Sequence, residues 1–366
     1  MKVGILTYYG VHNHGAVLQA YGLKSILRDM GHSVRFLSFE RSYEYIASSQ
    51  ASKYKLGLSS IPFYAKYLID KGIGNILFNI KKRNVLKKFR SQNFDLSTSY
   101  KDFNGDVTVI GSDEVFSLQI GYNPFMYGYG LHSKRIVSYA GSFGPTTIKE
   151  IESKGKEELI KNGFKNNFQS ISVRDLNSKN IVQTLSGRDV TLVCDPVILY
   201  GFKKEMDYFK PKERDYIVVY AYDNRMNDEK EISYIKAYAR KHHLKIYSVG
   251  FYHSWCDKCI PASPFELLGW IRNAKLVITD TFHGSVLSII CNTPMVAKLR
   301  DNSNKLRYLL HEYGLENRII DDFQMLETVS NMPLDFTECN KILESKREQS
   351  LAFLKDAIGE LENDQN

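Results

Sequence analysis

The chain has 366 residues, more than one hydrophobic core usually supports, and this length predicts two domains. A hydrophobic fraction of 43% and a charged fraction of 25% are those of an ordinary folded protein and exclude general disorder. Forty-nine basic and 41 acidic side chains give a net charge of +8, which suits an anionic partner. The excess is too small to indicate nucleic acid, and no nucleic-acid-binding motif is present.

The start of the chain and its cysteines indicate the cellular compartment in which the protein folds. The first ten residues, MKVGILTYYG, run directly into a strand pattern and do not resemble a secretory signal. Five cysteines are an odd and sparse set for this length, which argues against a disulfide framework and favours a reducing compartment. No stretch reaches the ~18 consecutive apolar residues that a membrane span requires. We therefore expect a cytoplasmic protein.

Strand and helix patterns alternate through the first half of the chain. Residues 2–7 form a short buried strand, 16–31 carry apolar residues at helical spacing, and 33–39 are again strand-like. The alternation returns with strand patterns at 106–112, 135–142, 170–175 and 190–196, and a helical stretch at 148–161. This order predicts a parallel sheet flanked by helices.

An insertion at about residues 41–100 interrupts this alternation. It contains a cluster of basic residues, Lys81, Lys82, Arg83, Lys87, Lys88 and Arg90. One interpretation is an interfacial segment that contacts anionic lipid as a peripheral membrane element. The other is a pair of helices with a solvated basic face. The sequence alone leaves both open.

A second α/β series follows a charged connection near residue 200. Strand patterns occupy 216–222, 243–250, 274–280 and 293–299, separated by helical patterns at 228–243, 263–273 and 284–292. The predicted organisation is an N-terminal α/β domain over 1–198, a C-terminal α/β domain over 199–340 and a closing helix over 341–366. The sequence makes no prediction of the oligomeric state.

In open α/β sheets ligands bind at the carboxyl ends of the strands, so we consider the polar turns that follow each strand. The first turn contains Asn13 and Gly15 before a helix whose free amides can hold an anion. Its glycines do not have the GxGxxG spacing of a dinucleotide site. Asn13 is either a ligand contact or a cap of the turn.

The second turn places Ser112 and Asp113 after an apolar strand. Asp113 is either a general base or hydroxyl acceptor at the rim of the crevice, or an N-cap of the following helix. In the third turn, Gly141 and Ser142 permit close backbone approach to a ligand.

The fourth and fifth turns contribute a cation and an imidazole. Arg174 ends a strand and is costly to bury without an anion, either the neighbouring Asp175 or a ligand carboxylate or phosphate. His283 lies on a turn after Asp280, beside a helix start, where it can donate to an anion or transfer protons. The alternative is a buried structural histidine bonded to Asp280.

In this order the motifs resemble one family, the polysaccharide pyruvyl transferases, over about residues 3–320. The resemblance rests on NHGAVLQAYGL, VIGSDEVFS, SYAGSFG, SVRD, CDPVILY, ITDTFHGSVLSIICNTP and NKLRYLLHEYGLENR. Glu114 and Phe116 stand where members often carry glutamine and tryptophan, and His14 stands where an aromatic residue is frequent. These departures concern the acceptor substrate expected for a member of this family rather than its donor substrate.

The resemblance implies two Rossmann-like α/β domains similar to the B-type glycosyltransferase fold, with the active site in the cleft between them. It implies transfer of the enolpyruvyl unit of phosphoenolpyruvate onto two hydroxyls of a sugar, or of a lipid-linked oligosaccharide, during synthesis of a surface polysaccharide. The products are a cyclic pyruvate ketal and phosphate, and no cofactor is implied. By this resemblance, His283 matches a histidine of the family's donor site, and Arg174 matches the arginine of the SVRD motif.

The donor carries a carboxylate and a phosphate, so its pocket needs several hydrogen-bond donors. The candidates are Arg174, His283, Lys305, Arg307 and the amides of Gly284 and Ser285. We expect His283 to act as acid or phosphate partner and Asp113 as base. The remaining predicted substrate contacts are Asn13, Gly15, Ser112, Gly141 and Ser142.

Other interpretations compete with this one. His253, Cys256 and Cys259 have spacings found in zinc sites but fall short of the four ligands of a structural site, so we expect no metal. A nucleotide-sugar transferase of the same B-type architecture is one rival function. A carbohydrate-binding protein without catalysis is the other.

Overall fold

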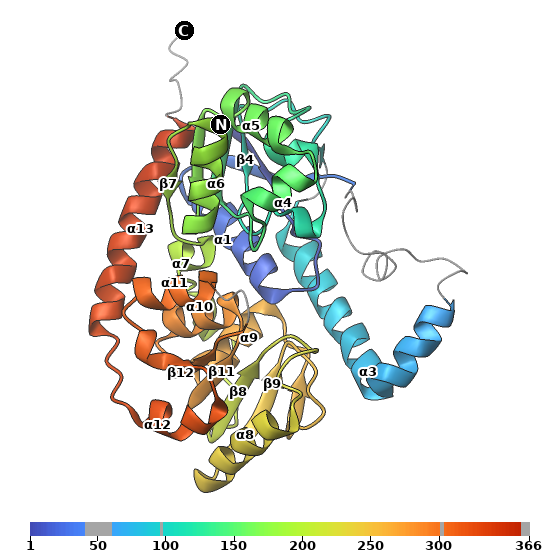
Figure 1. Ribbon diagram of the computed structural model, residues 1–366, viewed down its shortest axis with the longest axis vertical. Coiled ribbons are helices and arrows are strands. Elements are labelled where there is room, and N and C mark those ends of the chain that lie inside the picture. The colour runs from blue at the N-terminus through green and yellow to red at the C-terminus, as the bar shows by residue number, and fades with distance from the viewer. Residues whose placement is uncertain (41–60, 96–97, 301–303, 360–366) are drawn as a thin grey trace.

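The protein was analysed as a computed structural model, which describes residues 1–40, 61–95, 98–300 and 304–359; for 61–71 and residue 304 it gives the backbone alone. Two parallel sheets form two α/β domains, one above the other in Figure 1. Helices cover both sheets, and the predicted fold class is confirmed.

The N-terminal sheet has the strand order β3-β2-β1-β4-β5-β6-β7. Its strands are β1 (Lys2–Leu6), β2 (Ser33–Ser38), β3 (Thr98–Ser99), β4 (Val107–Ile110), β5 (Arg135–Gly141), β6 (Ser170–Val173) and β7 (Thr191–Leu192). The C-terminal sheet has the order β10-β9-β8-β11-β12-β13. Its strands are β8 (Tyr216–Tyr220), β9 (Lys245–Val249), β10 (Lys258–Ile260), β11 (Leu276–Thr279), β12 (Met295–Lys298) and β13 (Ile319–Ile320).

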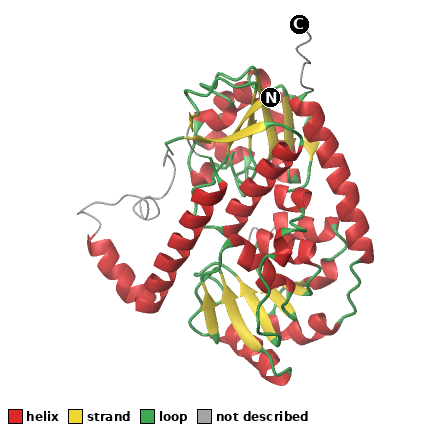
Figure 2. Cartoon of the chain, turned by 180° about the vertical axis from the view of Figure 1, so that it is seen from behind, coloured by secondary structure: helices red, strands yellow, loops and turns green. Residues whose placement is uncertain are grey.

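The helices connect these strands and cover their faces (Figure 2). In the N-terminal half they are α1 (His14–Asp29), α3 (Ile61–Asn93), α4 (Ile148–Ser153), α5 (Glu157–Asn166), α6 (Leu176–Ser186) and α7 (Pro196–Tyr200). In the C-terminal half they are α8 (Glu229–Lys241), α9 (Pro264–Arg272), α10 (Phe282–Cys291), α11 (Asn304–Glu312), α12 (Leu326–Asn331) and α13 (Thr337–Ile358). The predicted helix at 148–161 is divided in two, because Gly155 turns the backbone at φ 62°.

The strand order determines where ligands can enter. In each sheet the chain builds outward from a central strand and then returns to its other side, between β1 and β4 and between β8 and β11. Ligands bind at such reversals, beyond the carboxyl ends of the strands. All four residues of β4 (VTVI) and all five of β8 (YIVVY) are buried, so both faces of these strands are covered.

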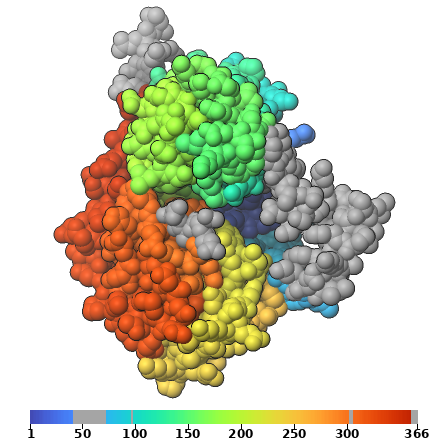
Figure 3. All heavy atoms as spheres, viewed as in Figure 1, coloured from blue at the N-terminus to red at the C-terminus, as the bar shows by residue number. Residues whose placement is uncertain are grey.

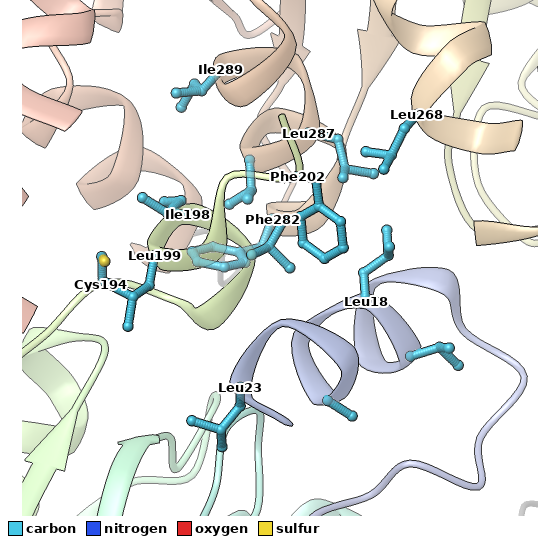
Figure 4. Packing of buried hydrophobic residues seen from close by; sticks show 14 of the residues in the cluster. Leu18, Leu23, Cys194, Ile198, Leu199, Phe202, Leu268, Phe282, Leu287 and Ile289 are labelled. Carbon is cyan, nitrogen blue, oxygen red and sulfur yellow. The ribbon is translucent and has the colours of Figure 1, made fainter. Parts of the chain in front are cut away.

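An apolar core joins the two domains. Figure 4 shows Leu18 and Leu23 of α1 close to Ile198 and Leu199 of α7, with Phe282 and Leu287 of α10 nearby. These side chains belong to one continuous cluster that also includes α9 and strands of both sheets. The domains therefore share a hydrophobic interface, which restrains their relative motion.

The last helix returns to the N-terminal domain (Figure 1). Arg347 of α13 donates from Nε to the Ile198 carbonyl at 2.6 Å, and Arg135 of β5 donates to the Ala357 carbonyl at 3.3 Å. Helix α13 starts at Thr337 and ends before Gly359; residues 360–366 of the predicted closing helix lie outside the described ranges. The domain boundaries themselves stay a prediction.

The insertion contains the long helix α3, which bends where Gly72 leaves helical geometry at φ 74° and ψ 156°. The part of the insertion at 41–60 lies outside the described residues. Within the ranges that the structure describes, no helix combines the length and apolar character needed to cross a membrane.

His14, which precedes the helix predicted over 16–31, is instead the first residue of α1 and completely buried. Its Nε2 lies 2.7 Å from the Ala262 carbonyl of the C-terminal domain. Burial and the nearby Lys82 lower the pKa of His14 to about 3, against 6.5 for an exposed histidine. His14 is therefore a neutral link between the domains.

This link predicts a dependence of stability on pH. Between about pH 6.5 and about pH 3 the unfolded chain binds a proton at His14 that the folded chain does not, so stability falls as the pH is lowered through this window. A difference of one bound proton between the two states changes the free energy of unfolding by about 1.4 kcal/mol per pH unit. We expect His14→Gln to reduce the slope by up to this amount. Urea unfolding at steps between pH 6 and pH 4 measures this slope, and an unchanged slope would contradict a neutral, buried His14.

Candidate functional site

A cavity of about 410 Å³ lies between the two domains. Figure 3 shows the hollow where the two halves meet, with residues of the N-terminal segment visible in it. Its size falls within the range of small-molecule sites. The lining residues are Tyr8, Val11, Asn13, Ala16, Asp113, Glu114, Ile120, Arg174, Tyr222, Arg225, Asp280, Thr281, Phe282, His283, Lys305 and Leu306. Most of them follow β1, β4, β8 and β11, as the strand order requires.

Arg174 is buried and joins two carboxylates. Its Nη2 donates to Asp113 Oδ1 at 2.8 Å, and its Nη1 donates to Asp195 Oδ2 at 2.7 Å. The sequence neighbour Asp175 is not its partner. Asp175 caps α6 through the Ser178 amide at 2.8 Å and accepts from Ser142 Oγ at 2.6 Å. A guanidinium shared by two carboxylates forms charge-assisted hydrogen bonds with a defined geometry.

The charge of Asp113 follows from this geometry. Burial disfavours its ionised form, but Arg174, His283 and Lys305 outweigh burial and lower the pKa of Asp113. Asp113 is therefore ionised near neutral pH. Its backbone is left-handed at φ 74°, an unfavourable conformation for aspartate that accompanies its position at the cavity wall.

His283 lies within a helix rather than on a turn, contrary to the sequence prediction. Helix α10 begins at Phe282, and the N-cap Thr281 accepts from the Gly284 amide at 2.9 Å. The imidazole Nε2 is 3.8 Å from Asp195 Oδ2 and finds no hydrogen-bond partner among the described residues. Burial lowers the pKa of His283, against the opposing effect of Asp195 and Asp113, so the ring is neutral near pH 7.

Asp280 does not hold His283 in place. Its Oδ2 accepts from Arg300 Nε at 3.1 Å, and its Oδ1 lies 3.7 Å from Arg225 Nη1. Burial raises the pKa of Asp280 despite these two arginines. The alternative of a structural Asp280–His283 pair is therefore wrong, and His283 faces Asp195 instead.

Gly15 lets α1 and α10 approach closely. A Cβ on Gly15 would lie 2.2 Å from His283 Cγ, far inside contact distance. A Cβ on Gly284 would lie 2.1 Å from Thr279 Oγ1, so this glycine is also required by packing. The absence of a side chain at Gly15 therefore lets α1 lie against the His283 ring.

An ion pair crosses the cleft between the domains. Lys305 of α11 contacts the Glu114 carboxylate, which follows β4. Burial lowers the pKa of Lys305, but Glu114 more than compensates, so its pKa is raised and it stays charged. The Phe282 ring lies 4.8 Å from the Arg174 guanidinium and packs against it.

The structure brings five of the predicted site residues to the cavity wall: Asn13, Asp113, Arg174, His283 and Lys305. Asn13 has both of its predicted roles available, because it lines the cavity and also caps α1 through the Gly15 amide at 2.8 Å. The other predicted residues do not line the cavity: Gly15, Ser112, Gly141, Ser142, Gly284, Ser285 and Arg307. Their role as substrate contacts stays a prediction.

These residues have identifiable partners elsewhere. Ser112 Oγ donates to the Ala140 carbonyl at 3.2 Å, and a Cβ on Gly141 would lie 2.3 Å from Phe116. Ser285 is buried in α10, whereas Arg307 is exposed on α11. Sequence reasoning missed Glu114 as an ion-pair partner, and it missed Tyr222 and Arg225. Tyr222 and Arg225 follow the carboxyl end of β8. Because ligands bind at the carboxyl ends of strands in open α/β sheets, this position in the sequence could have identified them.

The histidine and cysteines considered for zinc have other surroundings. The two ring nitrogens of His253 lie 2.9 Å from Ser248 Oγ and 3.0 Å from the Arg225 carbonyl. Cys259 Sγ lies 3.2 Å from the carbonyl of His253. Over the described ranges, no group of three or more histidine, cysteine, aspartate or glutamate side chains is arranged to hold a metal ion.

Comparison with known proteins places the chain within a family. A family model described as polysaccharide pyruvyl transferase matches residues 13–302. That range spans most of both sheets and all the lining residues named above except Tyr8, Val11, Lys305 and Leu306. No curated protein sequence matches the chain.

Two solved structures with similar folds are UDP-GlcNAc 2-epimerases. The UDP-GlcNAc 2-epimerase of Methanocaldococcus jannaschii, in complex with UDP-GlcNAc and UDP, is 12% identical with a TM-score of 0.50, and the match covers 94% of this chain and 99% of that chain. A putative UDP-N-acetylglucosamine 2-epimerase from Listeria monocytogenes is 10% identical with a TM-score of 0.53, covering 97% and 96%. Identities this low show the fold alone, which is the two-domain B-type arrangement.

Proposed function

We propose that this chain, which belongs to the polysaccharide pyruvyl transferase family, moves the enolpyruvyl group of phosphoenolpyruvate onto two hydroxyls of one sugar. The observation that carries the proposal is the shared cavity, where Arg174 and His283 from different domains meet beside Lys305. A small donor with two anionic ends suits a cavity that presents separate cations.

The cations of the cavity differ in how available they are to a donor. Arg174 already donates to two carboxylates, so its role in donor binding is mainly position and charge. Lys305 and Arg225 are partly exposed, at 33% and 37% of their side chains, and each is held by one carboxylate on the cavity wall. We assign binding of the donor phosphate to Lys305, which separates from Glu114 when the donor binds. We assign binding of the donor carboxylate to Arg225.

The proposed reaction needs two proton movements. The donor methylene carbon takes a proton and becomes a methyl group, which leaves C2 electron-deficient. Two sugar hydroxyl oxygens then bond to C2 in turn, while the C2–O bond to phosphate breaks. The two hydroxyls lose two protons in all. One equals the proton gained by the methylene carbon and the other leaves with phosphate, so the reaction needs no oxidant or cofactor. An acid and a base are required.

We assign the acid or phosphate partner to His283 and the base to Asp113. His283 is neutral in the free protein, and the charges of a bound donor favour its protonation. Asp195, 3.8 Å from Nε2, stabilises the resulting imidazolium. Asp113 is ionised and able to accept a hydroxyl proton, and Arg174 holds it at the cavity wall.

The acceptor in this proposal is a sugar of a surface polysaccharide or of its lipid-linked precursor, and the reaction takes place in the cytoplasm. Tyr8 and Tyr222 supply aromatic walls suited to a sugar ring. Burial raises the pKa of Tyr222, so its hydroxyl remains a neutral hydrogen-bond donor.

Two measurements test the proposal. We expect phosphoenolpyruvate to raise the melting temperature, by an amount corresponding to ~2.7 kcal/mol at a hundredfold excess over its Kd, and UDP to leave it unchanged. We expect phosphate release from phosphoenolpyruvate to require a glycan from an acceptor panel. Lys305→Gln should weaken donor binding, while Lys236→Gln, an exposed change on α8, should not.

Other outcomes identify the rivals. Stabilisation by UDP without stabilisation by phosphoenolpyruvate would establish a nucleotide-sugar transferase and overturn the proposal. Glycan binding without phosphate release from any member of the panel would favour a carbohydrate-binding protein.

A further inference from the structure

One face of α3 exposes large apolar side chains. Ile73, Leu77 and Ile80 are 70%, 54% and 51% exposed, which is unusual for isoleucine and leucine. Their spacing of four and three residues places them on one side of the helix. Asn84 and the two lysines Lys87 and Lys88 continue the same side toward the C-terminal end.

The opposite face of α3 is fixed to the rest of the protein. Phe78 packs on Tyr252 at a ring distance of 5.7 Å, and Phe89 packs on Phe265 at 4.9 Å. The ammonium of the buried Lys82 lies 4.3 Å from the centre of the Phe251 ring. These contacts hold the described part of α3 against the C-terminal domain, so the outward face has a defined orientation. Figures 1 and 2 show α3 projecting beside the two domains.

The charge around this face has one sign. Residues 71–93 contain seven basic side chains and no acidic one. Lys81, Arg83, Lys87 and Lys88 are exposed. On a helical projection, Lys81 and Arg83 flank the apolar side chains, and the other two extend the same face. Such an arrangement matches an anionic surface with an apolar interior.

We propose that this face of α3, made of Ile73, Leu77 and Ile80 with the four surrounding cations, rests on an anionic lipid bilayer. Two copies of the chain would bring eight like charges together on this face, which disfavours a dimer through it. A lipid surface instead accepts the apolar side chains and pairs with every cation.

The position of α3 relates the lipid surface to the cavity. Arg90, near the end of α3, donates from Nη1 to the carbonyl of Val11 at 3.3 Å, and Val11 lines the cavity. A lipid-linked sugar could therefore reach the cavity from the same surface. This inference refines the acceptor class of the proposed function, but the membrane contact stands independently of the donor.

Vesicle co-sedimentation without donor or acceptor tests the contact. We expect the protein to sediment with vesicles of phosphatidylcholine and phosphatidylglycerol, and to do so weakly with phosphatidylcholine alone or in 1 M salt. Lys81→Gln, Lys87→Gln and Lys88→Gln together should reduce partitioning by about a hundredfold, from roughly fivefold for each cation. Replacing Ile73, Leu77 and Ile80 with serine should reduce it at both low and high salt.

A matched control separates this face from net charge. Lys236→Gln, Arg240→Gln and Lys245→Gln remove three exposed charges from α8 and β9 and should leave partitioning within twofold. Circular dichroism shows whether each variant is folded. Equal loss in the α8 control, or no binding of the folded wild-type protein to anionic vesicles, would overturn the proposal. A dimer in light scattering that the serine variant dissociates, without lipid binding, would assign the face to a second copy.

Phosphate release separates this outcome from failure of the proposed function. With a soluble glycan acceptor, both α3 variants should retain wild-type release, because neither change touches the cavity. Loss of lipid binding with wild-type phosphate release would therefore test the role of α3 without testing the proposed transfer reaction.

Discussion

His283→Ala is expected to lower phosphate release from phosphoenolpyruvate by about 10²- to 10⁴-fold in the presence of an acceptor, the usual effect of losing a positioned acid or base. The variant removes the imidazole that faces Asp195 across 3.8 Å at the start of α10. It leaves the backbone amides and their Thr281 cap in place. A single-turnover phosphate assay with saturating acceptor measures the effect on the chemical step.

The control for this variant is His132→Ala, an exposed histidine outside the cavity, which should retain full release. A melting temperature within a few degrees of wild type shows that His283→Ala is folded. Phosphate release above half of the wild-type rate would remove His283 from the proton and phosphate roles. It would leave the donor cavity itself in place.

Arg174→Ala is expected to destabilise the protein and to abolish phosphate release. The change leaves Asp113 and Asp195 close together and without their shared cation. Removing one partner of a buried ion pair typically costs about 3–5 kcal/mol of unfolding free energy. Urea denaturation at pH 7 measures the loss. Arg35→Ala, which removes an exposed pair at 4.0 Å, is the control and should cost at most about 1 kcal/mol.

The stability difference between wild type and Arg174→Ala depends on pH. Arg174 helps to keep the pKa of Asp113 below its unfolded value, so the pair stabilises the protein above about pH 4 and loses that effect as the pH falls through the folded pKa. The difference between wild type and Arg174→Ala should therefore narrow under acid conditions.

A compensated variant separates stability from catalysis. Adding Asp113→Asn and Asp195→Asn to Arg174→Met removes the unpaired charges and should restore much of the lost stability without restoring phosphate release. An Arg174→Ala protein as stable as wild type would contradict the buried ion-pair unit.

The sequence predicts the fold because alternating apolar runs and helical spacings are local patterns, and the strand-end rule then locates the turns that form the cavity. It could not assign the partner of Arg174, because Asp175 is adjacent in sequence but caps a helix, whereas Asp195 is brought in by the fold. Arg307 lies two residues from Lys305, and helical geometry turns it toward solvent.

The glycines illustrate the same limit. Gly15 and Gly284 belong to motifs that resemble an anion site, yet the contacts they permit are with His283 and Thr279 of the protein itself. A pattern in the sequence shows that a small residue is needed, but only the tertiary structure shows what approaches it.

The continuous apolar core through α1, α7, α9 and α10 also limits how substrates enter. A wide hinge-like opening of the two lobes would expose that core to water, so the width of the slot is largely set when the chain folds. The Lys305–Glu114 ion pair spans the two domains at the cavity wall, and under the proposed function an incoming donor phosphate would replace Glu114 as the partner of Lys305. Within the described residues, selectivity for compact, multiply charged molecules would thus follow from the fixed spacing of the two domains.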